Sequence, residues 1–295
     1  MNKIPNLKLL SGRDIPQIGL GTWGIGGGPV RDPNNDDSGQ IASIKYAIDN
    51  GFSLIRTAHN YAQGYCEEVV GKAIQGYDRK NLFLVSCANQ KTAVDKKSII
   101  EVAKGSLKSM NADYFDLFLI GAVNPDTSVK SILDGLVYLQ EHGLAKDIGV
   151  SNYRLPELKA AVEYLGPKIV YNEMHYNLII REPEICGALD YCREKGIILS
   201  AYRPLQLGQL SKPGIVLLDQ MAKKYDKTQS QIALKWLIQK PGVITMTKAA
   251  NQNHIDQDLD VFEWEISKED IKKLDSDFPI QIRISDCSEP RTFKF

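Results

Sequence analysis

Short apolar runs alternate with longer segments of helical periodicity along almost the whole chain. The runs have the length and composition of β-strands. The strand candidates are Gln17–Thr22, Phe52–Thr57, Leu82–Cys87, Tyr114–Ile120, Ala145–Ser151, Ile169–Glu173, Ile197–Ala201 and Val243–Thr247. The helical segments are Gln40–Asn50, Lys97–Met110, Ser128–His142, Leu155–Tyr164, Glu184–Lys195, Lys212–Tyr225 and Thr228–Gln239.

Strands that are each separated by helical sequence pair in parallel, and this pattern predicts an α/β fold, a closed (β/α)8 TIM barrel. The first sixteen residues predict an N-terminal β-hairpin with Ser11-Gly12-Arg13-Asp14 as its turn. No linker, repeat or low-complexity stretch divides the chain, so we expect one barrel domain over residues 1–295. In such barrels the chemistry lies at the C-terminal ends of the strands.

Composition narrows the kind of partner. Basic and acidic residues balance at 36 each, so no basic excess favours a nucleic-acid partner. No apolar stretch is long enough to suggest a membrane span or a signal peptide. The cysteines form no CxxC pair, and the histidines lack a metal-binding spacing. We therefore expect a cytoplasmic monomer that acts on a small molecule and holds no metal.

Four motifs stand in order at predicted strand ends. They are Ile18-Gly19-Leu20-Gly21-Thr22-Trp23, Gly149-Val150-Ser151-Asn152, Ala201-Tyr202-Arg203-Pro204-Leu205, and Thr247-Lys248-Ala249-Ala250 followed by His254-Ile255. Together they resemble the aldo-keto reductase family over about Leu9 to Asp275. The resemblance implies NADPH-dependent carbonyl reduction. It also implies that Ser151 and Asn152 hold the nicotinamide carboxamide, that Tyr202 stacks on the nicotinamide ring, and that Lys248 grips the adenosine 2′-phosphate.

Three of the four residues that this family uses for catalysis are replaced. In relatives a tyrosine acid is assisted by Lys, Asp and His, because a phenol with a pKa near 10 needs help from a neighbouring cation. The segment Ile55–Tyr61 keeps the tyrosine as Tyr61 but places Arg56 at the Asp position. Cys87 stands where the family has Lys, and Gly121 where it has His.

The nucleotide site departs from the family pattern as well. Glu173 takes the place of a glutamine, Thr247 of a proline and Asp258 of an asparagine. Two added carboxylates near a phosphate-bearing ligand are unfavourable, so we expect only weak residual NADPH binding. The function that we favour from the sequence requires no cofactor.

We interpret the replaced centre as an engineered or sharply diverged cysteine hydrolase acting on an activated ester. Cys87 is in phase with Phe83 and Val85, so its thiol should point inward at the barrel mouth. Arg56 and His59 should then lower the pKa of Cys87 below the roughly 8.5 of a free thiol. A Cys–His pair of this kind is sufficient for covalent acyl transfer if oxyanion donors are present.

Further side chains complete the expected pocket. Candidate oxyanion donors are Asn60, Asn89, Gln90 and Tyr61; Trp23 should form a wall, Gly121 should enlarge the cavity, and His175 is the alternative base. Two other interpretations stay open. One is an NADPH-dependent carbonyl oxidoreductase in which Tyr61 is the acid and Arg56 the cation. The other is a catalytically inactive NADPH-binding or scaffold protein, in which Cys87 is merely a small buried hydrophobe.

Overall fold

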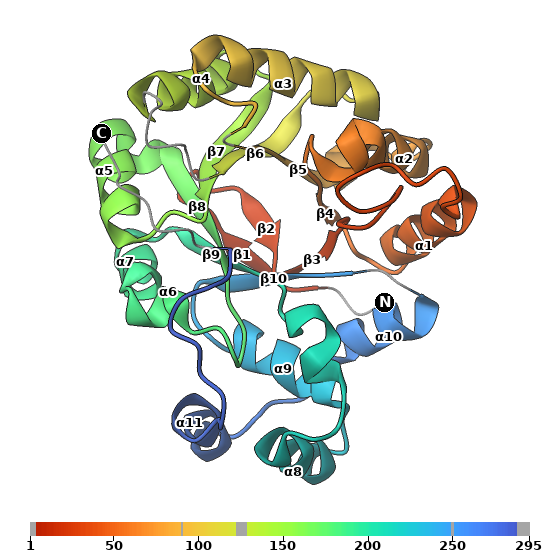
Figure 1. Ribbon diagram of the computed structural model, residues 1–295, viewed down its shortest axis with the longest axis vertical. Helices are drawn as coiled ribbons and strands as arrows, with labels where there is room; N and C mark the ends of the chain where they lie inside the picture. The colour runs from red at the N-terminus through yellow and green to blue at the C-terminus, as the bar shows by residue number, and fades with distance from the viewer. Residues whose placement is uncertain (1–3, 90, 122–128, 249–250, 288–295) are drawn as a thin grey trace.

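The computed structural model describes residues 4–89, 91–121, 129–248 and 251–287. Eight parallel strands form a closed barrel in the order β10-β3-β4-β5-β6-β7-β8-β9, and helices surround it (Figure 1). The strands are β3 (Ile18–Gly21), β4 (Leu54–Arg56), β5 (Phe83–Ala88), β6 (Phe115–Gly121), β7 (Ala145–Ser151), β8 (Ile169–His175), β9 (Ile198–Tyr202) and β10 (Val243–Thr247). Each coincides with a predicted strand to within a few residues, so the barrel prediction is confirmed.

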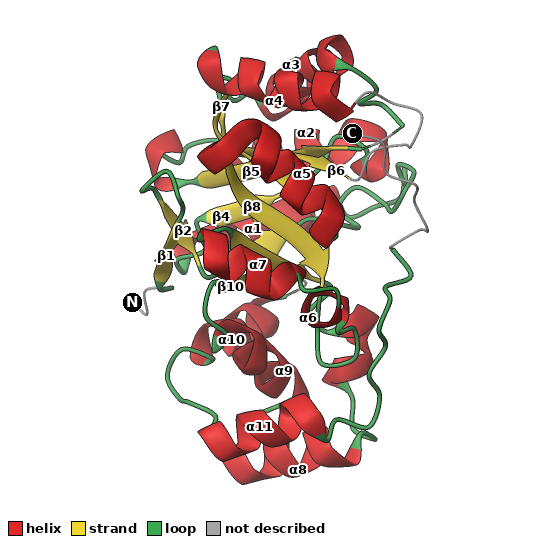
Figure 2. Cartoon of the chain, turned by 90° about the vertical axis from the view of Figure 1, so that its left-hand side faces the viewer, coloured by secondary structure: helices red, strands yellow, loops and turns green. Residues whose placement is uncertain are grey.

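Helices lie on the outside of the barrel; most connect successive strands, and the last two follow β10. They are α1 (Asp37–Asp49), α2 (Tyr65–Ile74), α3 (Lys96–Met110), α4 (Val129–Glu141), α5 (Leu155–Leu165), α6 (Glu182–Ile185), α7 (Ala188–Lys195), α8 (Val216–Tyr225), α9 (Gln229–Ile238), α10 (Gln252–Asp260) and α11 (Lys268–Ser276). The single helix expected over Glu184–Lys195 is two, because Gly187 adopts a left-handed φ of +78° between α6 and α7. Figure 2 shows α8 and α11 side by side at one end of the molecule. No helix in the described ranges has the length and apolarity that a membrane span requires.

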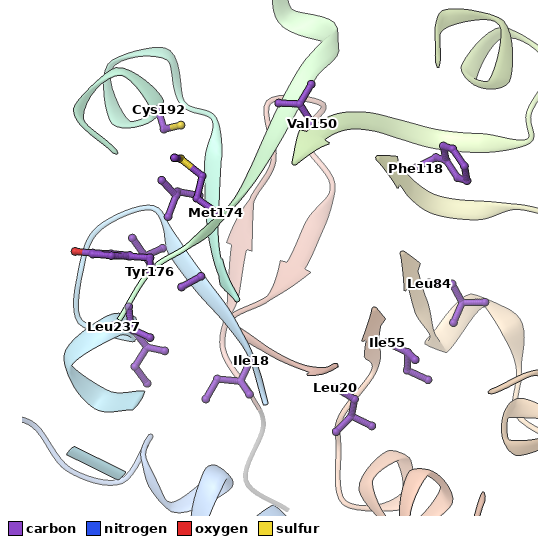
Figure 3. Close-up of a cluster of buried hydrophobic side chains, with 14 of the residues drawn as sticks. Ile18, Leu20, Ile55, Leu84, Phe118, Val150, Met174, Tyr176, Cys192 and Leu237 are labelled. Carbon is purple, nitrogen blue, oxygen red and sulfur yellow. The ribbon is translucent and has the colours of Figure 1, made fainter. Parts of the chain in front are cut away.

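Alternating strand side chains form two hydrophobic layers, as the period of two requires. Outward-facing residues such as Leu84, Phe118 and Val150 pack between the strands and the helices (Figure 3). Inward-facing residues fill the barrel; among them are Leu54, Val85, Leu119, Tyr171 and Ile244. The barrel interior is therefore a packed core, and only its ends are open to chemistry.

An antiparallel hairpin of β1 (Asn6–Lys8) and β2 (Asp14–Pro16) closes the N-terminal end of the barrel. Arg13 Nη1 donates to Asp147 Oδ2 at 3.0 Å and to the Asp116 carbonyl at 2.9 Å, near the starts of β7 and β6. Leu9 and Ile15 pack with the barrel interior. The predicted hairpin is confirmed, although Asp14 belongs to the second strand rather than to the turn.

Candidate active site

A buried ion pair crosses the barrel at the C-terminal ends of its strands. Arg56 follows the inward-facing Leu54 on β4, and Glu173 follows the inward-facing Tyr171 on β8. These two strands are opposite one another in the ring. Arg56 Nε donates to Glu173 Oε2 at 2.9 Å and Nη2 to Oε1 at 2.5 Å. The guanidinium and carboxylate thus form a two-pronged, charge-assisted pair shielded from water.

Tyr61 completes this cluster from the loop after β4. Arg56 Nη1 donates to the Tyr61 hydroxyl at 2.7 Å and to the Thr57 carbonyl at 3.0 Å. The edge of the Trp23 ring packs against Tyr61, with ring centroids 4.9 Å apart. Burial raises the pKa of Tyr61 to about 12, although the Arg56 charge acts in the opposite direction. At neutral pH the phenol is therefore protonated and held beside a cation, the state that a proton donor requires.

Cys87 points inward, as predicted, but its thiol is not activated. It packs in the same interior cluster as Phe83 and Val85. Burial raises the pKa of Cys87 to about 12; the Arg56 charge favours the thiolate, but the nearby Glu173 carboxylate opposes it. The expectation of a pKa below that of a free thiol is therefore wrong, because desolvation outweighs a cation that is already paired.

His59 lies next to Cys87 in the structure but does not face its sulfur. Its Nδ1 is 3.0 Å from the Cys87 carbonyl oxygen, an acceptor, so Nδ1 carries the hydrogen. Its Nε2 then accepts from Thr92 Oγ1 at 2.6 Å. The basic nitrogen of His59 is thus directed at Thr92, and the predicted Cys–His pair is absent from the described residues.

His175, the alternative base, is engaged elsewhere. Its Nδ1 lies 2.7 Å from Ser285 Oγ, and its Nε2 lies 2.8 Å from Gln206 Oε1. The ring stacks on Tyr202, with centroids 5.2 Å apart and planes 20° from parallel. Neither nitrogen is available to remove a proton from Cys87.

The residues expected to hold the nicotinamide do lie together. Ser151 Oγ donates to Glu173 Oε1 at 3.3 Å, and Asn152 Nδ2 lies 3.4 Å from Ser151 Oγ. The Tyr202 hydroxyl donates to Asn152 Oδ1 at 2.9 Å. Asn152 has a left-handed φ of +59°, a conformation that asparagine tolerates better than most residues. The ends of β7, β8 and β9 are thus joined in one polar network.

A second polar region lies where β10 ends. Lys248 is exposed there, and a Cβ built on Gly24 would lie 2.9 Å from its Nζ. The ammonium thus lies against the loop after β3, where Gly24 has a left-handed φ of +91° that favours glycine. An exposed lysine ammonium beside a glycine backbone is a suitable place for a phosphate group of a cofactor to bind. On α10, burial raises the pKa of Asp258 to about 7, so this carboxyl is partly neutral near physiological pH.

The remaining pocket residues have mixed outcomes. Trp23 lies beside Tyr61 and is 46% exposed. Asn60 is also exposed. Asn89 Oδ1 accepts from the Lys91 N–H at 2.9 Å within a local turn. A Cβ at Gly121 would lie 3.3 Å from the Ala88 carbonyl oxygen, and the enlargement of the cavity expected there stays a prediction. Gln90, Ala249 and Ala250 lie outside the described residues.

The C-terminal segment takes part in the site, which no sequence pattern indicated. Arg203 Nη1 lies 3.1 Å from Asp286 Oδ2, and Ser285 contacts His175. These contacts bring the chain after α11 to the ends of β8 and β9. No local spacing signals such a contact, because its partners are about a hundred residues apart.

The closed α/β barrel places a partly buried tyrosine beside a buried cation and carboxylate at the C-terminal ends of its strands, an arrangement that suits a barrel oxidoreductase. The family model described as "Aldo/keto reductase family" matches residues 17–277. The chain therefore belongs to the aldo/keto reductase family.

Characterised relatives and solved structures resemble the chain over nearly its full length. Glyoxal reductase of Bacillus subtilis is 31% identical over 272 residues, covering 92% of this chain and 91% of the relative. Methylglyoxal reductase YeaE of Escherichia coli is 29% identical, covering 90% and 92%. A thermostable aldo-keto reductase solved with the inhibitor epalrestat has a TM-score of 0.88 at 35% identity, covering 92% and 99%. An aldo/keto reductase of Klebsiella pneumoniae in complex with NADP and acetate has a TM-score of 0.85 at 28% identity, covering 96% and 99%.

These similarities overturn the hydrolase interpretation. The relatives are named as reductases, and solved neighbours hold NADP or NADPH. The prediction of a cysteine hydrolase, and with it the prediction that no cofactor is required, is wrong. The physical reason is visible in the site, where Cys87 is a buried neutral thiol without a base.

Proposed function

We propose that the protein is an NADPH-dependent reductase of small reactive carbonyl compounds, with Tyr61 as the proton donor. The observation that carries this proposal is the 2.7 Å contact between Arg56 Nη1 and the Tyr61 hydroxyl. Relatives named glyoxal reductase and methylglyoxal reductase support a 2-oxoaldehyde or dialdehyde as the substrate class.

The replaced tetrad keeps a cation and a carboxylate, but on different strands. Arg56 on β4 supplies the positive charge beside the phenol, in place of the family's lysine. Glu173 on β8 balances that charge, in place of the family's aspartate. Because the guanidinium already meets the hydroxyl in the resting protein, it needs no rearrangement to stabilise the phenolate.

In the proposed reduction, the cofactor supplies the hydride and the protein supplies the proton. Bound NADPH supplies the hydride that reaches the carbonyl carbon. Tyr61 gives its proton to the carbonyl oxygen as negative charge develops there, and Arg56 stabilises the phenolate that is left. The phenolate then recovers a proton from solvent. With its pKa raised to about 12, Tyr61 carries its proton at neutral pH but gives it up less readily than a free phenol, so the transfer relies on Arg56 stabilising the phenolate as it forms.

The cofactor would be held by the residues described above. Ser151 and Asn152 offer hydrogen-bonding groups, Tyr202 offers an aromatic ring, and Lys248 offers a cation for phosphate. The proposed cofactor site needs no residue from a second copy, and we expect a monomer, which sedimentation velocity checks directly.

The test follows NADPH absorbance with glyoxal or methylglyoxal as substrate. We expect wild-type turnover, and a loss of about 100-fold or more in Tyr61→Phe, the range attributed to a general acid. Tyr77→Phe is the matched control, because the Tyr77 hydroxyl donates to Asp49 and to the Lys45 carbonyl, away from the site. Arg56→Lys should keep part of the activity, whereas Arg56→Met should lose it. Wild-type protein that binds NADPH but reduces neither substrate would refute the proposal in favour of an inactive NADPH-binding protein.

A further inference from the structure

Three metal-ligating side chains meet where the C-terminal segment crosses the end of β8. The Nδ1 of His175, a carboxylate oxygen of Asp286 and the Sγ of Cys287 all lie within 4.8 Å of one another. We propose that these residues bind a divalent cation of the zinc class. None of the three belongs to the Arg56–Tyr61 cluster, and His175 stacks on Tyr202 of the proposed cofactor site.

The separations between ligand atoms match those of a tetrahedral zinc site. Zinc lies about 2.0–2.1 Å from nitrogen or oxygen and about 2.3 Å from sulfur, so neighbouring ligand atoms are about 3.3 Å apart for N and O and about 3.6 Å for O and S. In the structure, His175 Nδ1 is 3.3 Å from Asp286 Oδ1, and Cys287 Sγ is 3.5 Å from the same oxygen. The third separation, from Nδ1 to Sγ, is at most 4.8 Å, and the Ser285 hydroxyl, 2.7 Å from Nδ1, has to move aside for an ion to fit.

A chain of hydrogen bonds fixes the lone pair of His175 toward the site. Asn177 Oδ1 accepts from the N–H groups of Ile179 and Ile180 at 2.9 and 2.8 Å, so its Nδ2 is a donor. That Nδ2 donates to Gln206 Oε1 at 2.9 Å, which makes this atom an acceptor. The His175 Nε2, 2.8 Å from Gln206 Oε1, must therefore carry the hydrogen. The unprotonated Nδ1 lies 2.7 Å from Ser285 Oγ and 3.3 Å from Asp286 Oδ1, so a metal ion bound at Nδ1 would take the place of the Ser285 hydroxyl.

The carboxylate is oriented by a second interaction. Arg203 Nη1 lies 3.1 Å from Asp286 Oδ2 and 3.3 Å from Oδ1. Ligating carboxylates are commonly held by such outer hydrogen bonds. The same guanidinium repels an incoming cation, so we expect an affinity below that of a closed four-cysteine site.

The mixture of donor atoms selects the metal. One imidazole, one carboxylate and one thiolate suit Zn²⁺ and its analogues Co²⁺ and Cd²⁺, whereas Mg²⁺ and Ca²⁺ prefer oxygen alone. Three protein ligands leave a fourth position for water. A bound ion would fasten Asp286 and Cys287 to β8, next to the Tyr202 ring on which His175 stacks.

Backbone hydrogen bonds just before Asp286 already hold the C-terminal segment against the end of β8. The Ile282 N–H donates to the Ile179 carbonyl at 2.7 Å, and the Arg181 N–H donates to the Ile282 carbonyl at 2.9 Å. The Ser285 N–H donates to Glu182 Oε2 at 2.8 Å. These contacts precede the two tail ligands by only a few residues, so little chain entropy remains to be lost on binding.

The test uses the full chain, freed of metal by a chelator and titrated with CoCl₂ without substrate or cofactor. We expect one equivalent of Co²⁺ to give a thiolate-to-metal charge-transfer band that ZnCl₂ then removes. Cys287→Ser should abolish the band, and Asp286→Asn should weaken binding about tenfold or more. Cys186→Ser is the matched control, because Cys186 is also partly buried but lies after α6.

Two results would overturn the proposal. One is wild-type protein that shows no thiolate band with an equivalent of Co²⁺. The other is a Cys287→Ser variant that keeps the wild-type band. Both Asp286 and Cys287 are at least partly exposed, so their variants should fold, and circular dichroism checks this. Metal binding is read without turnover, so its failure is distinguishable from failure of the reductase proposal.

Discussion

Replacing Glu173 by glutamine tests the buried ion pair on which the site is built. The substitution keeps the size of the side chain but removes the negative charge that faces Arg56. The Arg56 and Glu173 side chains are only 9% and 3% exposed. A glutamine oxygen still accepts one hydrogen bond, but the guanidinium cannot give up its proton. The variant therefore leaves a buried cation without a counter-ion.

The expected cost is large. Opposite charges about 4 Å apart attract by about 4 kcal/mol at the effective dielectric constant of proteins. Removing one partner of a buried pair typically costs about 3–5 kcal/mol, because the other charge remains desolvated. We expect the free energy of unfolding of Glu173→Gln to fall by that amount. The pKa of Tyr61 should fall as well, because Glu173 raises it and Arg56 lowers it.

Urea denaturation of a double-mutant cycle measures this cost. Arg56→Met combined with Glu173→Gln removes both charges, so the double variant should be more stable than Glu173→Gln alone. A coupling energy of about 2 kcal/mol or more would agree with a buried pair. A loss below about 1 kcal/mol in Glu173→Gln, the value of an exposed pair, would refute the reasoning.

Three further predictions follow from buried groups. Since burial raises the pKa of Cys87 to about 12, iodoacetamide near neutral pH should label it more slowly than Cys186, and Cys87→Ser should keep reductase activity. Burial raises the pKa of Glu67 from 4.5 to about 7, so the folded protein loses stability as pH rises through this window. Urea unfolding should then find Glu67→Gln equal to wild type at about pH 5 but more stable by up to about 3 kcal/mol at about pH 8; equal values at both pH values would contradict this. Asp258 ionises as pH rises through about 7, which disfavours an anionic ligand, so fluorescence titration should show NADPH affinity falling up to about tenfold there in wild type but not in Asp258→Asn.

Periodicity was sufficient to predict the barrel and the direction of its side chains. The eight strands carry short apolar runs because both of their faces are buried, and the inward phase of Cys87 with Phe83 and Val85 is confirmed. Family motifs placed Ser151, Asn152 and Tyr202 at neighbouring strand ends, where the structure joins them.

The protonation states could not be predicted in the same way. The pKa of Cys87 depends on desolvation and on Glu173, which lies on a distant strand. From the sequence we interpreted Glu173 as an unfavourable charge near a cofactor. Its partner Arg56 is 117 residues away in the chain, and no sequence pattern indicates that the two form a pair. In the folded protein, desolvation and the Glu173 carboxylate outweigh the Arg56 charge at the thiol, so the cysteine chemistry inferred from single replacements is wrong.

The N-terminal hairpin has a consequence for the order of folding. Arg13 leaves the ribosome early, but its partners Asp116 and Asp147 lie 103 and 134 residues later in the chain. At roughly 5–20 residues per second, the hairpin waits on the order of ten seconds before β7 exists. Leu9 and Ile15 meanwhile have no barrel to enter. A circular permutant could begin after Pro16 and carry the hairpin at its C-terminal end. Its hairpin should dock on the finished barrel as soon as it is made, and the protein should aggregate less during synthesis.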